Sequence, residues 1–351
     1  MAWRTGALVA LAPLLVATCT PAAGSFGSVR SSAQIVFMAP TGAAPVPGGA
    51  GAPDWELTVM DLDGPGREQV THNGEQEFLP HFSPDGTRLL YTRFTAGGYG
   101  MPGSKHRVTV YDFATRTTRD LTTGDAESYP VWSPDGSRIA YFRDLNCGPC
   151  PAIWVMNADG SGAQEIGRPA GGNFDRGWGD LAWSSQGWIL FVVIELGSNG
   201  DCFKTRLDKI RPDGTQRTKV TDGGPNCTPP GMEQSGDADP GFSADGAVIY
   251  TSRGFPYSPP GMPGATVRKL YAVSSDAWYP GKQESDLSLP SEPDCVEGVP
   301  KGSPDGARIL LFRACGPGKP SGVMVTDTNG SYRTRIADGF GPDWNPAWKP
   351  R

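Results

Sequence analysis

The chain alternates between apolar and polar positions in short runs that recur along most of its length. One kind of run ends in a polar turn, as in Leu57-Thr58-Val59-Met60-Asp61, and related runs occupy residues 108–112, 153–157, 207–210, 270–273 and 323–326. A period of two residues is typical of a half-buried β-strand. Short segments such as Val70-Thr71 and Leu121-Thr122 follow the turns and predict additional outer strands.

A second pattern alternates with the first and consists of an aromatic residue, a turn sequence and an apolar strand. Its clearest copies are Phe82-Ser83-Pro84-Asp85-Gly86 and Trp132-Ser133-Pro134-Asp135-Gly136, and weaker copies occupy residues 183–187, 242–246 and 302–306. Proline presets φ for the turn, aspartate accepts nearby backbone donors, and glycine takes the position with positive φ. This chemistry predicts tight β-hairpins.

Together the two patterns make a repeating unit of two hairpins, or four strands, at a spacing of about 45–63 residues. That is the unit of a propeller blade. The second hairpin occurs six times and the complete first hairpin five times, so we expect the missing one to be split between the chain ends. Residues 346–348 would supply its first strand and residues 35–38 its second. The prediction is an all-β, six-bladed β-propeller of four-stranded blades, closed by pairing of the N-terminal and C-terminal strands in one blade.

These motifs resemble the TolB-like family of six-bladed propellers, whose repeat carries the same Pro-x-Trp-Ser-Pro-Asp-Gly core. The resemblance covers residues 33–351. It implies the propeller fold and leaves function open, because the family includes binding modules and the propeller domains of peptidases. TolB itself has a separate α/β domain before its propeller, whereas in this chain we expect only a short tether. We therefore do not extend the TolB role in outer-membrane maintenance to this chain.

The N-terminus has the layout of an export signal. Arg4 precedes an apolar stretch over residues 7–17 that is too short to span a bilayer comfortably. Residues 16–19 resemble a bacterial lipobox, which makes Cys19 the predicted lipidation site, although Thr18 departs from the usual small residues. Soluble secretion with cleavage near Ala22 or Ala23 is the alternative.

The predicted organisation is thus a signal peptide over residues 1–18, a flexible tether over 19–32 and a single propeller over 33–351. We expect an exported protein at the outer face of the cell membrane, held there only through a lipid anchor, or a secreted one. The net charge of −6 and pI near 5.2 argue against nucleic-acid binding.

Apart from Cys19 the chain has an even number of cysteines, as expected for disulfides in an exported protein: Cys147, Cys150, Cys202, Cys227, Cys295 and Cys315. Cys295 and Cys315 flank one hairpin turn, and Cys202 and Cys227 flank another, so each pair is predicted to form a bridge. The Cys147-x-x-Cys150 spacing also occurs in redox motifs, but those open a helix in a βαβ unit, so a clamped loop is the preferred interpretation.

Acidic residues recur three positions before the proline that opens each innermost strand. They are Glu77, Glu127, Asp237, Glu297 and Asp343, and Trp178 takes the equivalent place in the third unit. Because innermost strands line the channel, we expect these six positions to bind ligand at an acidic mouth, on the face with the long loops. Converging carboxylates favour a cation such as Ca²⁺ or a basic peptide. Alternatively, each accepts donors from its own loop.

The preferred function is a non-catalytic ligand- or protein-binding propeller of the bacterial cell envelope, monomeric, with an envelope protein, peptide or glycan as partner. Aromatic loop tips could contribute to binding: Tyr99, Met101, Phe255, Tyr257 and Met262. The alternative is a propeller-channel enzyme, of lyase or peptidase-accessory type, that uses channel carboxylates. Three histidines, all in the first third, and the lack of a Gly-x-Ser-x-Gly elbow weigh against catalysis.

Overall fold

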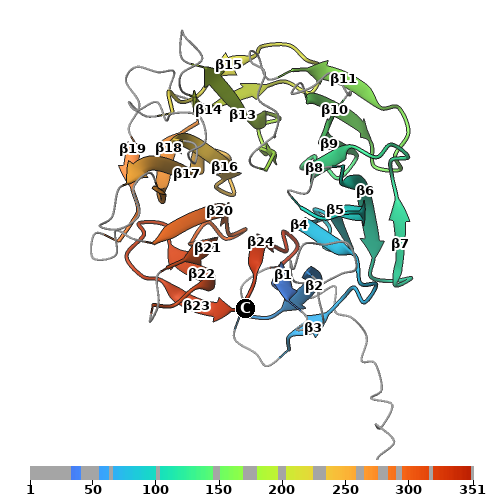
Figure 1. Ribbon diagram of the computed structural model, residues 1–351, viewed down its shortest axis with the longest axis horizontal. Coiled ribbons are helices and arrows are strands. Elements are labelled where there is room, and N and C mark those ends of the chain that lie inside the picture. The colour runs from blue at the N-terminus through green and yellow to red at the C-terminus, as the bar shows by residue number, and fades with distance from the viewer. Residues whose placement is uncertain are drawn as a thin grey trace, which may run out of the picture.

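The protein folds as an all-β propeller, with sheets arranged radially around a central channel (Figure 1). This is seen in a computed structural model, which describes residues 33–40, 55–62, 66–99, 103–144, 151–168, 180–196, 203–223, 235–257, 265–275, 284–289, 295–315 and 319–348. Within these ranges no helix is long and apolar enough to cross a membrane.

Four of the sheets have four antiparallel strands each. From the channel outward, these strands are β24 (Phe340–Trp344), β1 (Ile35–Pro40), β2 (Trp55–Met60) and β3 (Glu68–Gln69); β4 (Gln76–Phe82), β5 (Arg88–Ala96), β6 (Lys105–Asp112) and β7 (Thr117–Asp120); β8 (Glu127–Trp132), β9 (Arg138–Arg143), β10 (Ala152–Asn157) and β11 (Gln164–Gly167); and β20 (Val296–Gly302), β21 (Arg308–Ala314), β22 (Gly322–Asp327) and β23 (Thr334–Ala337).

A fifth sheet contains eight strands. They are β12 (Ala182–Trp183), β13 (Ile189–Leu196), β14 (Phe203–Ile210), β15 (Thr218–Lys219), β16 (Ser235–Phe242), β17 (Val248–Tyr257), β18 (Ala265–Ser274) and β19 (Glu284–Asp286). Strands β12–β15 and β16–β19 each repeat the order of a four-stranded sheet. A short parallel pairing of β14 with β16, at Lys204–Ser235 and Thr205–Gly236, joins the two halves.

The predicted Ser-Pro-Asp-Gly hairpins are present, and one hydrogen-bond pattern explains them. The Ser83 hydroxyl donates to Asp85 Oδ1 at 2.6 Å and accepts from the Arg88 amide at 2.9 Å. The Gly86 amide donates to the Ser83 carbonyl at 2.8 Å, and its φ of +72° is in the region that favours glycine. Equivalent serine–aspartate bonds recur at Ser133, Ser243 and Ser303. The face of the propeller that carries these turns is called the turn face below.

The two ends of the chain pair in one sheet, but not through the residues predicted from the sequence. Strand β24 pairs with β1 at Ile35–Trp344 and Val36–Asp343, whereas residues 346–348 were expected to form the strand. Instead, the amide of Trp348 donates to the Asn345 carbonyl at 3.0 Å, which is the bond that Gly86 makes to Ser83 in the second sheet. Residues 345–348 are therefore the turn.

Burial explains this register. The Trp344 side chain is buried against Ile35 and Phe37, while Trp348 packs at the edge of the same cluster. The aromatic position of the repeat is thus filled by Trp344, and Asn345 replaces the usual serine. The last innermost strand is therefore shifted by four residues from its predicted position in the repeat. Asp343 consequently does not occupy the position of the other predicted acidic residues.

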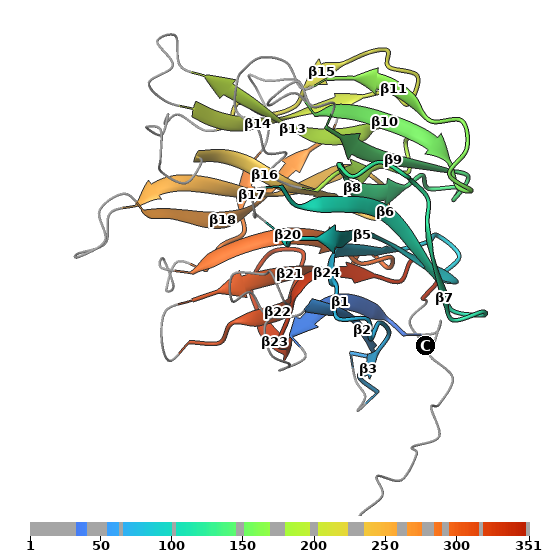
Figure 2. The ribbon, with the colours of Figure 1, turned by 45° about the vertical axis from the view of Figure 1, so that its right-hand side comes forward.

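Neighbouring sheets pack face to face around the channel (Figure 2), and the core lies between them. One cluster combines Val36 and Leu57 of the first sheet with Leu89 and Tyr91 of the second. Burying side chains of this size contributes about 1.5–3 kcal/mol each. Arginines add contacts across the same boundaries, since the Arg88 guanidinium lies 4.6 Å from the centre of the Trp132 ring in the next sheet.

The predicted bridge between Cys295 and Cys315 is formed and joins the residues that flank the β20–β21 hairpin. Cys19, Cys147, Cys150, Cys202 and Cys227 lie outside the described residues.

Candidate functional site

A cavity of about 280 Å³ lies on the channel axis at the turn face. Its centre is lined by the penultimate residue of each innermost strand: His81, Val131, Ala182, Gly241, Lys301 and Asp343. Side chains alternate between the two faces of a strand, so the same position of each repeat meets the channel in every sheet. The sequence pattern therefore dictates which six residues share this cavity.

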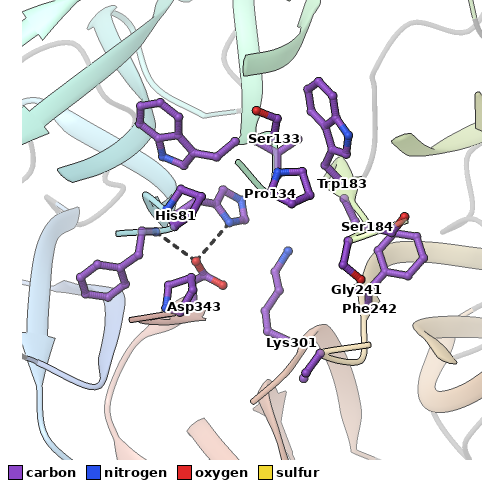
Figure 3. A pocket seen from close by; sticks show the side chains of 18 of the residues that line it. His81, Ser133, Pro134, Trp183, Ser184, Gly241, Phe242, Lys301 and Asp343 are labelled. Atoms are coloured by element: carbon purple, nitrogen blue, oxygen red, sulfur yellow. Dashed lines mark hydrogen bonds and ion pairs between the residues drawn. The ribbon is translucent and has the colours of Figure 1, made fainter. Parts of the chain in front are cut away.

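The wall of the cavity is aromatic and hydroxylic (Figure 3). Phe82, Trp132, Trp183 and Phe242 are the aromatic residues of successive turn motifs, and prolines and serines of the same turns complete the lining. Mostly apolar walls with a few placed polar groups are typical of ligand pockets.

Charged side chains meet across the channel beside this cavity. The carboxylate of Asp180, two residues before β12, lies 3.0 Å from His81 Nε2 on β4 and 2.5 Å from Lys301 Nζ on β20. The other ring nitrogen of His81, Nδ1, lies 3.4 Å from Asp343 Oδ2, and that oxygen also accepts from the Phe82 amide at 3.1 Å. The cluster links three strands, β4, β20 and β24, and the segment before β12.

The environment fixes the protonation states of His81 and Asp180. Burial alone would lower the pKa of His81, but the negative charge of Asp180 and hydrogen bonds to Asp180 and Asp343 raise that pKa to about 9. Burial would raise the pKa of Asp180, but His81 and Lys301 lower it to about 2. At neutral pH the two residues are therefore an imidazolium and a carboxylate.

Four of the predicted acidic residues lie at the opposite ends of their strands, away from this cavity. Each faces an arginine on the neighbouring strand, and the pairs are Glu77–Arg93, Glu127–Arg143, Asp237–Arg253 and Glu297–Arg313. Asp237 receives two hydrogen bonds from Arg253, at 2.7 and 3.1 Å. Glu127 lies 3.3 Å from Arg143, and Glu297 lies 2.8 Å from Arg333 and 3.6 Å from Arg313.

Glu77 is held by side chains of its own loop. It accepts from the Thr71 hydroxyl at 2.9 Å and from the Asn73 side-chain amide at 2.8 Å. Burial, followed by the neighbouring Glu56, raises the pKa of Glu77 well above its usual range. Glu127, Asp237 and Glu297 are thus paired with arginines inside their own sheets, and Glu77 accepts hydrogen bonds from its loop. A role of these four residues in ligand binding stays a prediction.

Asp343 does not share a ring with those four acids, because the register of β24 moves it to the turn-face cavity beside His81. Trp178 lies outside the described residues. Within the described ranges, no group of three or more His, Cys, Asp or Glu residues is arranged to hold a metal ion.

The aromatic loop tip that the structure describes packs on its own sheet. The Tyr99 ring stacks on Phe78 with centroids 4.3 Å apart and meets the edge of Phe94 at 6.4 Å, yet 46% of the residue is exposed. The side chains of Met101, Phe255, Tyr257 and Met262 lie outside the described part of the chain.

The sequence interpretation missed His81, Asp180 and Lys301 as site residues. A signal for two of them was present, since His81 and Lys301 occupy the place just before the first residue of the 82–86 and 302–306 turn motifs. The arginine partners were also detectable, because each lies 16 residues after its acid, as in Asp237 and Arg253.

Comparison of the coordinates with solved structures identifies the class of fold. TolB from Acinetobacter baumannii matches with a TM-score of 0.61 and 16% identity, over 91% of this chain and 67% of that chain. A protein assigned as TolB from Agrobacterium tumefaciens gives 0.56 and 18%, over 79% and 86%. A propeller from a nidogen/laminin complex gives 0.55 and 11%, over 89% and 98%. No protein-family model and no curated protein matches the sequence.

The protein therefore has a TolB-like β-propeller fold. At these identities the likeness concerns the fold alone.

Proposed function

We propose that the protein is a non-catalytic binding protein of the bacterial cell envelope that receives a segment of a partner in the turn-face cavity. The observation that carries this proposal is the cavity itself, where aromatic turn residues surround a charged floor on the channel axis. Its volume of about 280 Å³ lies near the lower limit of ligand pockets. It therefore suits one or two residues of a peptide better than a large ligand.

The proposal includes a closed ring of six blades. Its support is the contribution of one residue to the cavity from each of β4, β8, β12, β16, β20 and β24, together with the pairing of β24 with β1. A closed ring would hold the cavity walls at fixed separation, as binding without a large conformational change requires.

Export and lipidation of Cys19 also belong to the proposal. The disulfide between Cys295 and Cys315 is compatible with an oxidising compartment. A partner that is a protein is supported by the propeller seen in the nidogen/laminin complex, a protein assembly.

The long-loop face, with its acidic residues, is a second place where a partner could bind, as the sequence predicted. The turn-face cavity is favoured because Glu127, Asp237 and Glu297 are each engaged by an arginine of their own sheet. The same ion pairs do not favour the enzymatic alternative, in which two channel carboxylates would act on a substrate.

Capture from an envelope extract with matched aromatic variants tests this function. We expect Trp183→Ala and Phe242→Ala to lose the captured partner, because both rings line the cavity, while Tyr99→Ala at the opposite face retains it. Loss in Tyr99→Ala with full capture by Trp183→Ala would move the binding site to the long-loop face.

A further inference from the structure

We infer that the turn-face cavity recognises its ligand through a carboxylate group, which Lys301 binds. This inference rests on the proposed function, since it concerns the chemistry of the same cavity.

Lys301 is placed to contact a ligand directly. Its side chain extends toward the middle of the cavity (Figure 3) while the residue is only 8% exposed. Within the described part of the chain its amine has one hydrogen-bond and ion-pair partner, Asp180. An ammonium group has three donors, so two remain for acceptor atoms of a ligand.

The contacts of His81 leave Lys301 as the hydrogen-bond donor for a ligand. Both ring nitrogens of His81 are engaged, one by Asp180 and the other by Asp343. His81 therefore supplies charge to the cavity, and Lys301 supplies the hydrogen bonds.

The free ammonium donors of Lys301 favour an anionic acceptor. His81 and Lys301 line the cavity as cations, and Asp343 is the charged residue of opposite sign in the lining. Asp180, which balances the second cation, is fully buried and lies 2.5 Å from Lys301 Nζ. The four charges sum to zero, so the ligand is bound through the free donors of Lys301. Bonds between an ammonium group and a carboxylate are among the stronger ones in proteins.

The carboxylate can come from the end of a peptide chain or from an aspartate or glutamate side chain. The aromatic and proline residues around Lys301 suit an apolar residue next to either kind of carboxylate. The two sources share one chemistry and are distinguished by the probes below.

Three N-acetylated peptides test the inference by calorimetry on the intact protein: Ala-Trp-Ala as the free acid, Ala-Trp-Ala as the amide, and Ala-Trp-Asp-Ala as the amide. We expect at least one acid-bearing peptide to bind at least tenfold more tightly than the neutral amide. The free acid binding best assigns a chain terminus, and the aspartate peptide binding best assigns a side chain.

The variant Lys301→Met should weaken the acid-bearing peptide at least tenfold and leave the neutral amide unchanged. Lys105→Met is the matched control, because that lysine is exposed and pairs with Asp125. The comparison of acid with amide on the unmodified protein needs no variant and stands even if Lys301→Met folds poorly.

Equal binding of acid and amide peptides, or no saturable binding of either acid peptide at millimolar concentration, would overturn the carboxylate inference. So would unchanged acid binding by folded Lys301→Met. These failures are distinct from failure of the proposed function, which the aromatic variants test through the natural partner.

Discussion

The Nζ atom of Lys301 lies 2.5 Å from Oδ2 of Asp180, although 121 residues separate the two in the chain. Through this contact strand β20 meets the segment before β12, although β16 lies between these strands around the channel (Figure 1), and His81 of β4 joins the same carboxylate. The innermost strands are thus connected by charge as well as by their packing.

Removing the shared carboxylate should destabilise the fold. Asp180→Asn leaves Lys301 and His81 buried beside each other with one carboxylate, Asp343, and breaking a buried pair costs about 3–5 kcal/mol. Urea denaturation should show this loss, and the double variant Asp180→Asn, Lys301→Met should regain part of it. Equal stability of Asp180→Asn and the unmodified protein would show that the cluster is not formed.

Stability should depend on pH through His81. Its folded pKa of about 9 exceeds the ordinary value of 6.5, so the contribution is complete below pH 6.5 and disappears as pH rises through 9. The expected loss of unfolding free energy between these values is about 3 kcal/mol. His81→Gln should flatten this part of the pH profile in urea denaturation. A profile of the same slope in the variant would contradict the assignment.

Low pH should also weaken this cluster, through protonation of Asp180. The folded pKa of Asp180, about 2, lies below the ordinary 3.8, so its contribution is present above pH 3.8 and is lost as pH falls toward 2. Asp180→Asn should therefore unfold with a weaker dependence on pH in this acidic range than the unmodified protein.

The arginine pairs should differ in strength according to burial. Arg253 is 7% exposed in its side chain and binds Asp237 with two hydrogen bonds, whereas Arg143 is 38% exposed and lies 3.3 Å from Glu127. We expect Arg253→Leu to cost about 3–5 kcal/mol. Thermal or urea unfolding should show a clearly smaller loss for Arg143→Leu, since solvent screens that pair. The reverse order would contradict the pairing scheme.

The register of the last strand has its own test. Trp344 is buried and its Nε1 donates to the Lys301 carbonyl at 2.9 Å, so Trp344→Ala should cost about 3–5 kcal/mol. Trp348→Ala should cost less, because Trp348 lies at the edge of the cluster. A larger loss for Trp348→Ala in urea unfolding would restore the strand position expected from the sequence.

Local chemistry explains what the sequence could predict. The Ser83-Pro84-Asp85-Gly86 turn is held by bonds among neighbouring residues, so its sequence is enough to identify the hairpin. The same holds for Cys295 and Cys315, which one hairpin brings together. The end of the chain misled the prediction because two tryptophans, Trp344 and Trp348, stand four residues apart and only burial distinguishes them.

The site could not be predicted as readily, because its contacts join distant parts of the chain. His81 and Asp180 are 99 residues apart, and nothing in the local sequence of either indicates the other. Four of the acids lie at the strand starts, whereas Asp343 does not. Their arginines, such as Arg253 for Asp237, follow at a fixed spacing, but the strand register is needed to recognise them as partners. When acidic residues recur at one position of a repeat, the residues opposite them on the neighbouring strand should therefore be checked for basic partners.

Photo-crosslinking from the two faces tests the central claim most directly. A photoreactive residue would replace Ala244, which is exposed and lines the turn-face cavity, or Tyr99 at the other face. We expect the partner from envelope extract to be crosslinked from position 244 and not from position 99, and Trp183→Ala to abolish the product. Crosslinking from position 99 with none from position 244 would contradict binding in the turn-face cavity.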